Sequence, residues 1–367
     1  MKPGRFIIRA NDNADGHLLP ICQFWGLFCI FETEDLLTFM KSIRQKLSYK
    51  HKNNKFLYYS FNYLQLLIPN FFFRVRLHKR LAALKDFDRT HIRQRVNYYN
   101  KLNRVRPLQS GTQLADFKLT DKFKVYFFDT YEFIRYFSSN LKANFLFGDI
   151  THVPDEPSVV KSRPIHGENE NSVILKLNKI RHYIFVDDKK AFEDKKNLLI
   201  GRSVVKLPPR IRFYEMYFNH PLCDIGQINT NKNQHWVKNK LTIDQFLDYK
   251  FILCIEGYDV ASNLKWVMSS NSLAVMPKPT FETWFMEGTL KPDYHYVLLK
   301  DDYSDLEEKI NYYATNTKAA LDIIKNANDY VSQFKDKKRE DLISLLVLEK
   351  YFYKTDQIKV SDSTLFD

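Results

Sequence analysis

The sequence predicts an α/β protein of two domains, and three observations lead to this prediction. Short runs rich in β-branched and aromatic residues alternate with helical patterns from about residue 122 onward, as is typical of α/β folds. Hydrophobic residues make up 44% of the 367 residues, which is enough for a large core in two domains. Only 10 glycines and 13 prolines occur, so long linkers and low-complexity arms are not expected.

The first part of the alternating region predicts several strands and a helix. The predicted strands are 124–129 (KVYFFD), 143–150 (ANFLFGDI), 182–187 (HYIFVD) and 197–204 (NLLIGRSV), and the predicted helix is 130–141. Each strand is a short apolar run, which is the pattern of a buried strand in a covered sheet.

The second part gives a clearer series. The predicted order is strand 250–257 (KFILCIEG), helix 259–271, strand 273–277 (LAVMP), helix 282–288, strand 294–299 (YHYVLL) and helix 304–316. This order is typical of half of a doubly wound nucleotide-binding sheet, in which ligands sit beyond the carboxyl ends of the strands. Two amphipathic helices, 317–334 and 337–354, are expected to close the chain as packing elements.

These patterns divide the chain into five predicted segments. They are an extension over 1–50, a basic, aromatic-rich helical segment over 51–110, an α/β domain over 111–205, a second α/β domain over 206–335, and a closing helix and tail over 336–367. The extension is either poorly ordered or results from a translation start assigned too far upstream, with Met40 as the alternative start. The last helix has room to cross back to the first domain.

The N-terminus and the cysteines favour a cytoplasmic protein. The first residues lack a compact apolar segment behind their basic residues, and the apolar run 18–31 is too short to span a bilayer. None of the four cysteines has CxxC spacing, and Cys223 and Cys254 lie in apolar sequence, where a reduced thiol is expected.

The positive charge is concentrated in one block. Residues 41–110 contain 17 Lys and Arg but only Asp86 and Asp88, a net charge of +15 in a chain whose total is +13. Such a block suits an anionic partner: nucleic acid, anionic lipid or a phosphorylated glycolipid. Its aromatic run beside Arg74 and Lys79 fits an interfacial segment on a membrane, and equally fits a helix that packs its apolar side on the core.

Three segments carry residues suited to chemistry. Asp149 follows an apolar strand, where a carboxylate could take a proton from an acceptor hydroxyl, although an aspartate there could equally cap the next turn. Gly201 would allow close approach of a ligand, and Arg202, Arg210 and Arg212 offer planar cations for a diphosphate, although each could be an ordinary surface arginine.

The third segment combines a strand end with a helix start. Glu256 and Gly257 end the strand, and the following helix would present free N–H groups and a positive dipole end to phosphate. Downstream, Glu282 could accept from ribose hydroxyls, or it could serve as a capping charge at the start of a helix.

These segments together resemble glycosyltransferase family 90, which includes protein O-glucosyltransferases and fungal capsule proteins. The likeness is closest to the bacterial lipopolysaccharide A branch, and it covers roughly residues 55–335. It rests on GDITHVP, on NLLIGRS with an arginine soon after, on EGYDVASNLKW with SSNSLAV, and on ETWF with LKPDYHYVLLKDDYSDLEEKI.

The resemblance implies a GT-B-like fold, with two Rossmann-like domains facing a cleft and an extra basic helical N-terminal segment. It also implies an inverting, metal-independent transfer of a hexose from UDP-glucose or UDP-galactose to a lipopolysaccharide or lipooligosaccharide core sugar. No cofactor is expected beyond the UDP-sugar. The enzyme would be cytoplasmic, peripheral on the inner face of the inner membrane and in contact with its anionic surface.

The resemblance also assigns roles to residues. Asp149 matches the family's catalytic aspartate. By its position alone, three residues beyond Asp149, His152 is expected on the acceptor side, where it could polarise an acceptor. The family's diphosphate-binding arginine aligns with Asn263 here, so Lys265, Arg202 or Arg210 would supply the charge. The residues expected to bind the donor are Gly201, Arg202, Ser203, Arg210, Gly257, Asp259, Ser262, Asn263, Lys265 and Glu282.

Other sequence signals are weaker. Asp86 and Asp88 satisfy the DxD pattern of metal-dependent sugar transferases, but they lie in a basic helical stretch without a preceding strand, so no metal site is expected. No GxxxxGK[ST], GxGxxG or GxSxG motif occurs. The rival hypothesis is a nucleic-acid-binding protein without catalytic activity that uses the basic block; the chain has no recognisable binding module, so no nucleic acid is expected.

Overall fold

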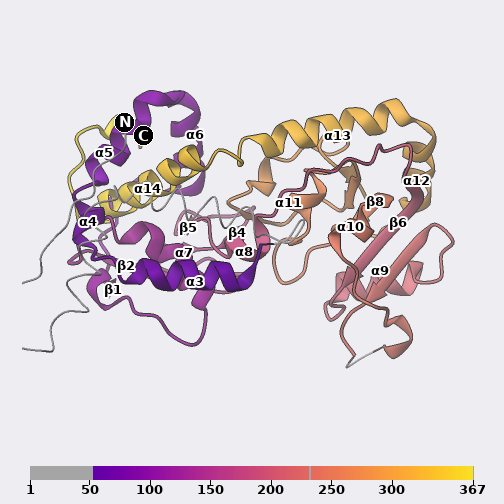
Figure 1. The fold of residues 1–367 in the computed structure, drawn as a ribbon, viewed down its shortest axis with the longest axis horizontal. Coiled ribbons are helices and arrows are strands. Elements are labelled where there is room, and N and C mark those ends of the chain that lie inside the picture. The colour runs from indigo at the N-terminus through magenta and orange to yellow at the C-terminus, as the bar shows by residue number, and fades with distance from the viewer. Residues whose placement is uncertain (1–52, 231–232, 367) are drawn as a thin grey trace, which may run out of the picture.

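The computed structural model describes residues 53–230 and 233–366. The predicted extension over 1–50, with Met40, lies outside the described residues. The described chain is an α/β structure whose elements form two lobes (Figure 1). The α/β prediction is therefore confirmed.

The first lobe contains a four-stranded sheet in the order β1-β2-β3-β5. Its strands are β1 (Thr112–Gln113), β2 (Lys142–Leu146), β3 (Ser158–Val160) and β5 (Ser172–Ile174). β1 is antiparallel to β2, and the other pairs are parallel. The surrounding helices are α3 (Lys55–Leu66), α4 (Phe71–Arg74), α5 (Leu77–Ala82), η1 (Ala83–Asp86), α6 (Arg89–Tyr99), η2 (Leu114–Asp116), α7 (Lys124–Ile134), α14 (Lys337–Lys354) and η5 (Ser363–Leu365).

The second lobe contains an all-parallel five-stranded sheet in the order β11-β9-β8-β6-β7. Its strands are β6 (Lys196–Ser203), β7 (Cys223–Gln227), β8 (Tyr249–Leu253), β9 (Leu273–Met276) and β11 (Val297–Leu298). Its helices are α9 (Pro208–Tyr217), η3 (Gln234–Trp236), α10 (Ile243–Phe246), α11 (Leu264–Val267), α12 (Leu306–Thr315) and α13 (Thr317–Ser332). Numbered within the sheet, the strand order is 2-1-3-4-5, a doubly wound order that reverses direction between β6 and β8.

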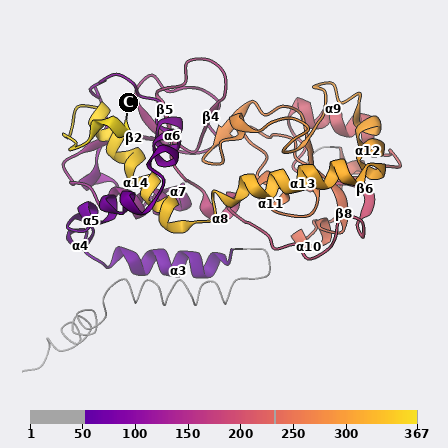
Figure 2. The ribbon, with the colours of Figure 1, turned by 90° about the horizontal axis from the view of Figure 1, so that it is seen from above.

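The lobes are joined by backbone pairing and by the last helices. β4 (Ser162–Pro164) pairs antiparallel with β10 (Phe281–Thr283), which is followed by η4 (Glu287–Thr289). The short α8 (Lys179–His182) lies between the lobes, and α13 runs along the second lobe before α14 returns to the first (Figures 1 and 2). The last helix therefore does cross back.

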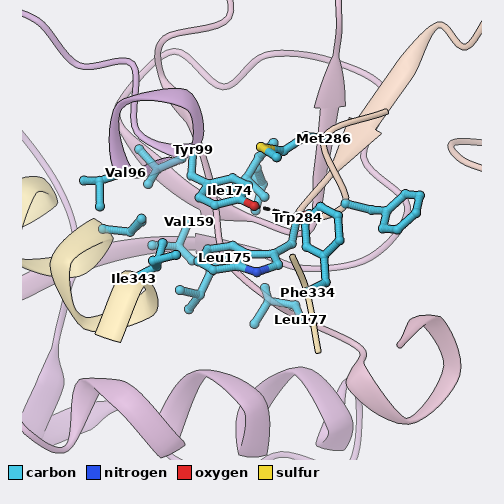
Figure 3. Packing of buried hydrophobic residues seen from close by; sticks show 14 of the residues in the cluster. Val96, Tyr99, Val159, Ile174, Leu175, Leu177, Trp284, Met286, Phe334 and Ile343 are labelled. Atoms are coloured by element: carbon cyan, nitrogen blue, oxygen red, sulfur yellow. Dashed lines mark hydrogen bonds between the residues drawn. The ribbon is translucent and has the colours of Figure 1, made fainter. Parts of the chain in front are cut away.

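A continuous hydrophobic cluster supports this junction. The rings of Tyr99 and Trp284 stack with centroids 3.8 Å apart, beside aliphatic side chains such as Val159, Ile174 and Leu177 (Figure 3). The indole N–H of Trp284 donates to Glu340 at 2.6 Å, and Arg95 donates to the same carboxylate at 2.8 Å. These three buried polar groups are thus paired with one another, as a low-dielectric interior requires.

Several predicted elements agree with the structure, and several do not. The runs 143–150, 197–204, 250–257 and 273–277 overlap β2, β6, β8 and β9, and 294–299 contains β11. The three predicted helices after residue 304 are present. Residues 124–129, predicted as a strand, begin α7 instead. Their aromatic side chains are largely buried, so the apolar run alone could not distinguish a helix from a strand.

Three further element predictions are wrong. Residues 182–187 form no strand, and the N–H of Val186 donates to the Ser269 hydroxyl instead. The predicted helix 259–271 contains only the four residues of α11, which ends in a tighter turn where the N–H groups of Ser269 and Ser270 donate to the carbonyls three residues earlier. The predicted helix 282–288 begins as β10, and the left-handed conformation of Met286 then breaks it.

The predicted domain limit near residue 205 separates β6 from the strands with which it pairs. Because β6 is hydrogen-bonded to both β7 and β8, the division between sheets falls before Lys196.

Candidate active site

A cavity of about 510 Å³ opens at the carboxyl ends of β6 and β8. Gly201, Arg202 and Ser203 line it from the end of β6, and Ile255 and Gly257 line it from the chain that follows β8. The strand order reverses between these two strands, so the cavity lies at the topological switch point. This is where open α/β sheets bind their ligands.

Asp149 reaches the same cavity from the other lobe. It follows β2, after a turn in which Gly148 takes a φ of +115°, a conformation that glycine adopts easily. Its side chain is 37% exposed and forms an ion pair with Lys161. One carboxylate oxygen is therefore held by a fixed cation while the group stays accessible from the cavity.

Arg210, on α9, links the two loops that border the cavity. Its guanidinium donates to the carbonyl oxygens of Val204 at 2.9 Å, Ile255 at 2.9 Å and Glu256 at 3.0 Å. Burial lowers the pKa of Arg210 from its ordinary value. A Cβ atom on Gly257 would lie 3.2 Å from the guanidinium, so the glycine permits this close packing. Three of the five N–H groups are used in this way, and two remain for a ligand.

The other β6 residues have structural contacts of their own. Arg202 donates to the Asp224 carboxylate at 2.9 Å, and this pair directs its guanidinium toward β7. The Ser203 hydroxyl lies 3.2 Å from that of Tyr214. A Cβ on Gly201 would meet Leu253 at 3.1 Å, so this glycine is needed for strand packing as well as for access to the cavity.

The segment after β8 forms an irregular wall. Asp259, Ser262 and Asn263 line the cavity, and the Asn263 amide donates to the Leu253 carbonyl at 2.9 Å. Because α11 has only four residues, the expected contribution of a helix N-terminus to phosphate binding is not supported. Side chains and loop N–H groups must supply the polar contacts.

Three predicted site residues lie away from the cavity. Lys265 is buried in an ion pair with Glu287, with 2.5 Å between Nζ and Oε1. Glu282 is buried at the β4–β10 junction, where it pairs with Arg163 at 2.8 Å. His152 is exposed and does not line the cavity. Burial of the Lys265 ammonium or the Glu282 carboxylate without a counter-charge would be costly, so each is paired with a residue of opposite charge.

The structure adds cavity residues that the sequence patterns did not single out. Arg181 and Lys206 line the cavity with exposed side chains and form no ion pair with any residue that the structure describes. Tyr258 is 58% exposed at the rim. Arg212, by contrast, is exposed on α9 outside the cavity. The sequence offers one sign that Lys161 is important: this lysine ends the apolar run SVVK, and a buried lysine needs a partner of opposite charge.

A second cavity of about 320 Å³ adjoins the first and shares Ile255 and Gly257 with it. Glu256 lines it, and burial raises the pKa of this carboxyl group, although the backbone N–H groups of Thr280 and Phe281 donate to it at 3.0 and 3.2 Å. The two cavities together follow the ends of β8 and β9.

Among the described residues, no group of three His, Cys, Asp or Glu side chains is placed to hold a metal ion. The DxD residues lie far from any strand end: Asp86 belongs to η1, and Asp88 caps α6 by accepting from the N–H of Thr90 at 2.8 Å. Cys223 and Cys254 are free thiols, as expected.

The basic segment both packs inward and exposes apolar side chains. Tyr58 and Phe61 on α3 are buried, and the Tyr58 hydroxyl donates to Asp129 at 2.8 Å. We define the α3–α5 surface by its exposed apolar residues, which are Phe56, Leu64, Leu67, Phe71, Phe72 and Val75. Arg74 and Lys79 are exposed beside them. In the described part of the chain, no helix is long and apolar enough to cross a membrane.

Comparison with known proteins identifies the family. Residues 187–351 match the family model described as Glycosyl transferase family 90. A protein of Dichelobacter nodosus named O-glucosyltransferase LpsA is 42% identical over 279 residues, covering 74% of this chain and 87% of the relative.

Two viral proteins share shorter stretches. Uncharacterized protein 179R of Invertebrate iridescent virus 6 is 30% identical over 47% of this chain and 15% of its own length. Uncharacterized protein 027R of Frog virus 3 (isolate Goorha) is 26% identical over 31% of this chain and 12% of its own length.

The bacterial relative matches this chain over most of both lengths, and the family model spans the second lobe and most of the residues that line its cavity. Such a match is incompatible with the rival hypothesis of a binding protein without catalytic activity. The chain belongs to glycosyl transferase family 90, and it is a glycosyltransferase.

Proposed function

We propose that this enzyme transfers a hexose, glucose or galactose, from a UDP-sugar to a core sugar of lipopolysaccharide or lipooligosaccharide. The observation that carries the proposal is the cavity at the ends of β6 and β8, which Asp149 enters from the opposite lobe. A nucleotide bound at the switch point would present its sugar toward that carboxylate. The relative's name, O-glucosyltransferase LpsA, supports glucose as one of the two donors to test.

The proposed reaction inverts the anomeric centre in one displacement. The acceptor hydroxyl gives its proton to the Asp149 carboxylate while its oxygen bonds to the anomeric carbon. The bond from that carbon to the diphosphate breaks, and UDP leaves with the electron pair. One carboxylate is sufficient as the base for this single step.

Charge accumulates on the departing diphosphate, so fixed donors near it stabilise the transition state more than the ground state. Arg181 and Lys206 are exposed cations in the cavity, and Arg210 retains two N–H groups. With these three residues available, we propose that no metal ion is required.

The proposal extends to the architecture and the location of the enzyme. The two lobes would form a GT-B-like pair of Rossmann-like domains, with the donor on the all-parallel sheet. The enzyme would act in the cytoplasm on the inner face of the inner membrane. The α3–α5 surface, with Arg74 and Lys79 beside exposed phenylalanines, fits an anionic bilayer.

The test is a transfer assay with UDP-glucose and UDP-galactose, truncated lipooligosaccharide as acceptor and a chelator throughout. We expect transfer from one donor despite the chelator. Asp149→Asn should lose at least about a thousandfold in kcat while UDP binding is retained, because the base is absent but the donor site is intact.

Asp155→Asn is the matched control, because Asp155 is an exposed aspartate of the same loop outside the cavity. It should leave kcat within a factor of two. Normal turnover by Asp149→Asn would refute the assignment of the base, and turnover abolished by the chelator would refute the metal-independent mechanism.

A further inference from the structure

A buried lysine connects the two lobes at the edge of the cavity. Lys161 lies between β3 and β4 of the first lobe, and its side chain is 1% exposed. Its ammonium pairs with Asp149, which follows β2, and lies 2.6 Å from Asp259, which follows β8 in the second lobe. One cation is thus shared between the carboxylate proposed as the base and a carboxylate of the wall on the donor side.

The two carboxylates differ in their surroundings. Asp259 is 6% exposed and also accepts from the Ser162 hydroxyl at 2.7 Å, so it is enclosed by polar partners. Asp149 is 37% exposed and faces the cavity. Burial would lower the pKa of Lys161, but the carboxylates of Asp259 and Asp149 outweigh this effect and raise it. The ammonium therefore stays charged throughout the working pH range.

We propose that Lys161 is the positioning residue of the base: it holds the Asp149 carboxylate fixed at the cavity, and ties it to the donor-side wall through Asp259. This inference rests on the proposed function. Because Lys161 is almost fully enclosed, it acts through Asp149 and does not touch the substrate.

Two other titratable groups beside the lysine, Tyr126 and His182, are neutral near pH 7. Burial raises the pKa of Tyr126, which faces the cluster from α7. Burial, reinforced by Lys265, Lys161 and Arg181, lowers the pKa of His182 on α8 well below its ordinary value. The charged groups that face Asp149 are therefore Lys161 and Asp259, together with the exposed cations Arg181 and Lys206 of the same cavity.

The test is the pH dependence of kcat/KM for variants of the full chain. Lys161→Met should move the acidic limb to higher pH by about one unit or more, because a nearby cation lowers a carboxyl pKa by about that amount. Lys161→Arg keeps the charge and should keep the limb near its wild-type position. In all variants that fold, the affinity for UDP should change less than kcat.

The double variant Lys161→Met/Asp259→Asn gives a second readout. It removes both buried charges, so it avoids the unpaired carboxylate that destabilises the single variant. Its acidic limb should lie between those of wild type and Lys161→Met, because the repulsion from Asp259 is gone while the cation is still missing. This variant keeps the proposal testable if Lys161→Met does not fold.

Lys195→Met is the matched control, because Lys195 is a buried lysine paired with Asp188 at 2.8 Å outside the cavity. This variant should lower Tm without moving the acidic limb of the pH profile. The proposal would be overturned if the double variant kept both the wild-type acidic limb of the pH profile and a kcat within threefold of wild type. It would also be overturned if Lys195→Met shifted the acidic limb as much as Lys161→Met does. Failure of the proposed function would be seen in other measurements: the wild-type enzyme would transfer no sugar, or Asp149→Asn would be fully active. In either case the role of Lys161 would be refuted as well.

Discussion

At the scale of single residues, Arg210 shows how one side chain can shape a binding site. Its three bonds to carbonyl oxygens fix the loop after β6 against the chain after β8. These bonds need the planar, forked geometry of a guanidinium, which a lysine cannot reproduce. The shape of the cavity therefore depends on the donor geometry of Arg210 and not only on its charge.

The corresponding prediction compares two arginines of the same helix. Arg210→Lys keeps the charge but loses the fork, so the loops should loosen and the Kd for UDP should rise about tenfold, equivalent to about 1.4 kcal/mol. Arg212→Lys, on an exposed side chain outside the cavity, should stay within twofold. Isothermal titration calorimetry measures both values, and equal Kd values for the two variants would contradict this role of Arg210.

The sequence predicts some site residues and misses others for a physical reason. Asp149, Gly201 and Gly257 could be found because each lies at or just beyond the end of an apolar strand, and the ends of such strands meet at a cleft. The pairing of Lys161 with Asp259 depends on how the two lobes meet, which no local pattern records. Glu282 looked like a cleft residue only because its strand, β10, and its partner Arg163 were not predicted.

At the scale of secondary-structure elements, α6, α14 and the β10 turn depend on one buried ion pair. Arg95 and Glu340 are each 2% exposed, with 2.8 Å between their charged atoms, and Glu340 also accepts from Trp284. Burial would raise the pKa of Glu340, but Lys176 and Arg95 outweigh it and lower the pKa below its ordinary value. The stability that this carboxylate contributes is therefore present above its unfolded pKa and is lost as pH falls through its folded pKa.

We accordingly predict that Glu340→Gln lowers the free energy of unfolding at pH 7 by about 3 kcal/mol, because the buried Arg95 loses its counter-charge. The difference from wild type should shrink at acidic pH, as the pH falls below the ordinary glutamate value of 4.5 and through the lowered pKa of Glu340, where the wild-type carboxylate becomes protonated. Urea unfolding at both pH values measures this, with the exposed Glu308→Gln as control. A difference that does not depend on pH would contradict the ionic role of Glu340.

Long periodic elements were predictable, and short ones were not. α12, α13 and α14 carry helical periodicity over ten or more residues each, so their pattern is unambiguous. Residues 124–129 form a short run buried on several sides, which fits a strand as well as the helix that they begin. In 259–271, a tighter turn ends the helix after four residues, an effect that hydrophobic patterns do not reveal.

At the scale of the whole molecule, the α3–α5 surface shares no residue with the cavity, which is lined mainly by the second lobe, so membrane binding and catalysis can be altered separately. We predict that Leu67→Ser/Phe71→Ser reduces co-sedimentation with anionic phospholipid vesicles several-fold, because these side chains are 67% and 65% exposed and would enter the lipid. Transfer to a water-soluble acceptor should stay unchanged.

The control for vesicle binding is Leu321→Ser, which removes an apolar residue that is 40% exposed on α13, in the other lobe. Raising the ionic strength should weaken the binding of the wild-type protein, since the cations of the α3–α5 surface attract the headgroups. Equal binding by the double variant and the wild type would exclude this surface as the membrane contact.

The return of α14 to the first lobe has a consequence for how the protein is synthesised. α14 packs its buried leucines and Tyr351 against the elements of the first lobe, which the ribosome makes much earlier. At a synthesis rate of about 5–20 residues per second, α14 is made many seconds after α6 and α7, whose apolar faces stay uncovered until then. The all-parallel sheet of the second lobe is complete before the first lobe can close. A nascent chain released before Lys354 would therefore contain every strand of both sheets and still leave its earliest lobe open to chaperones and proteases.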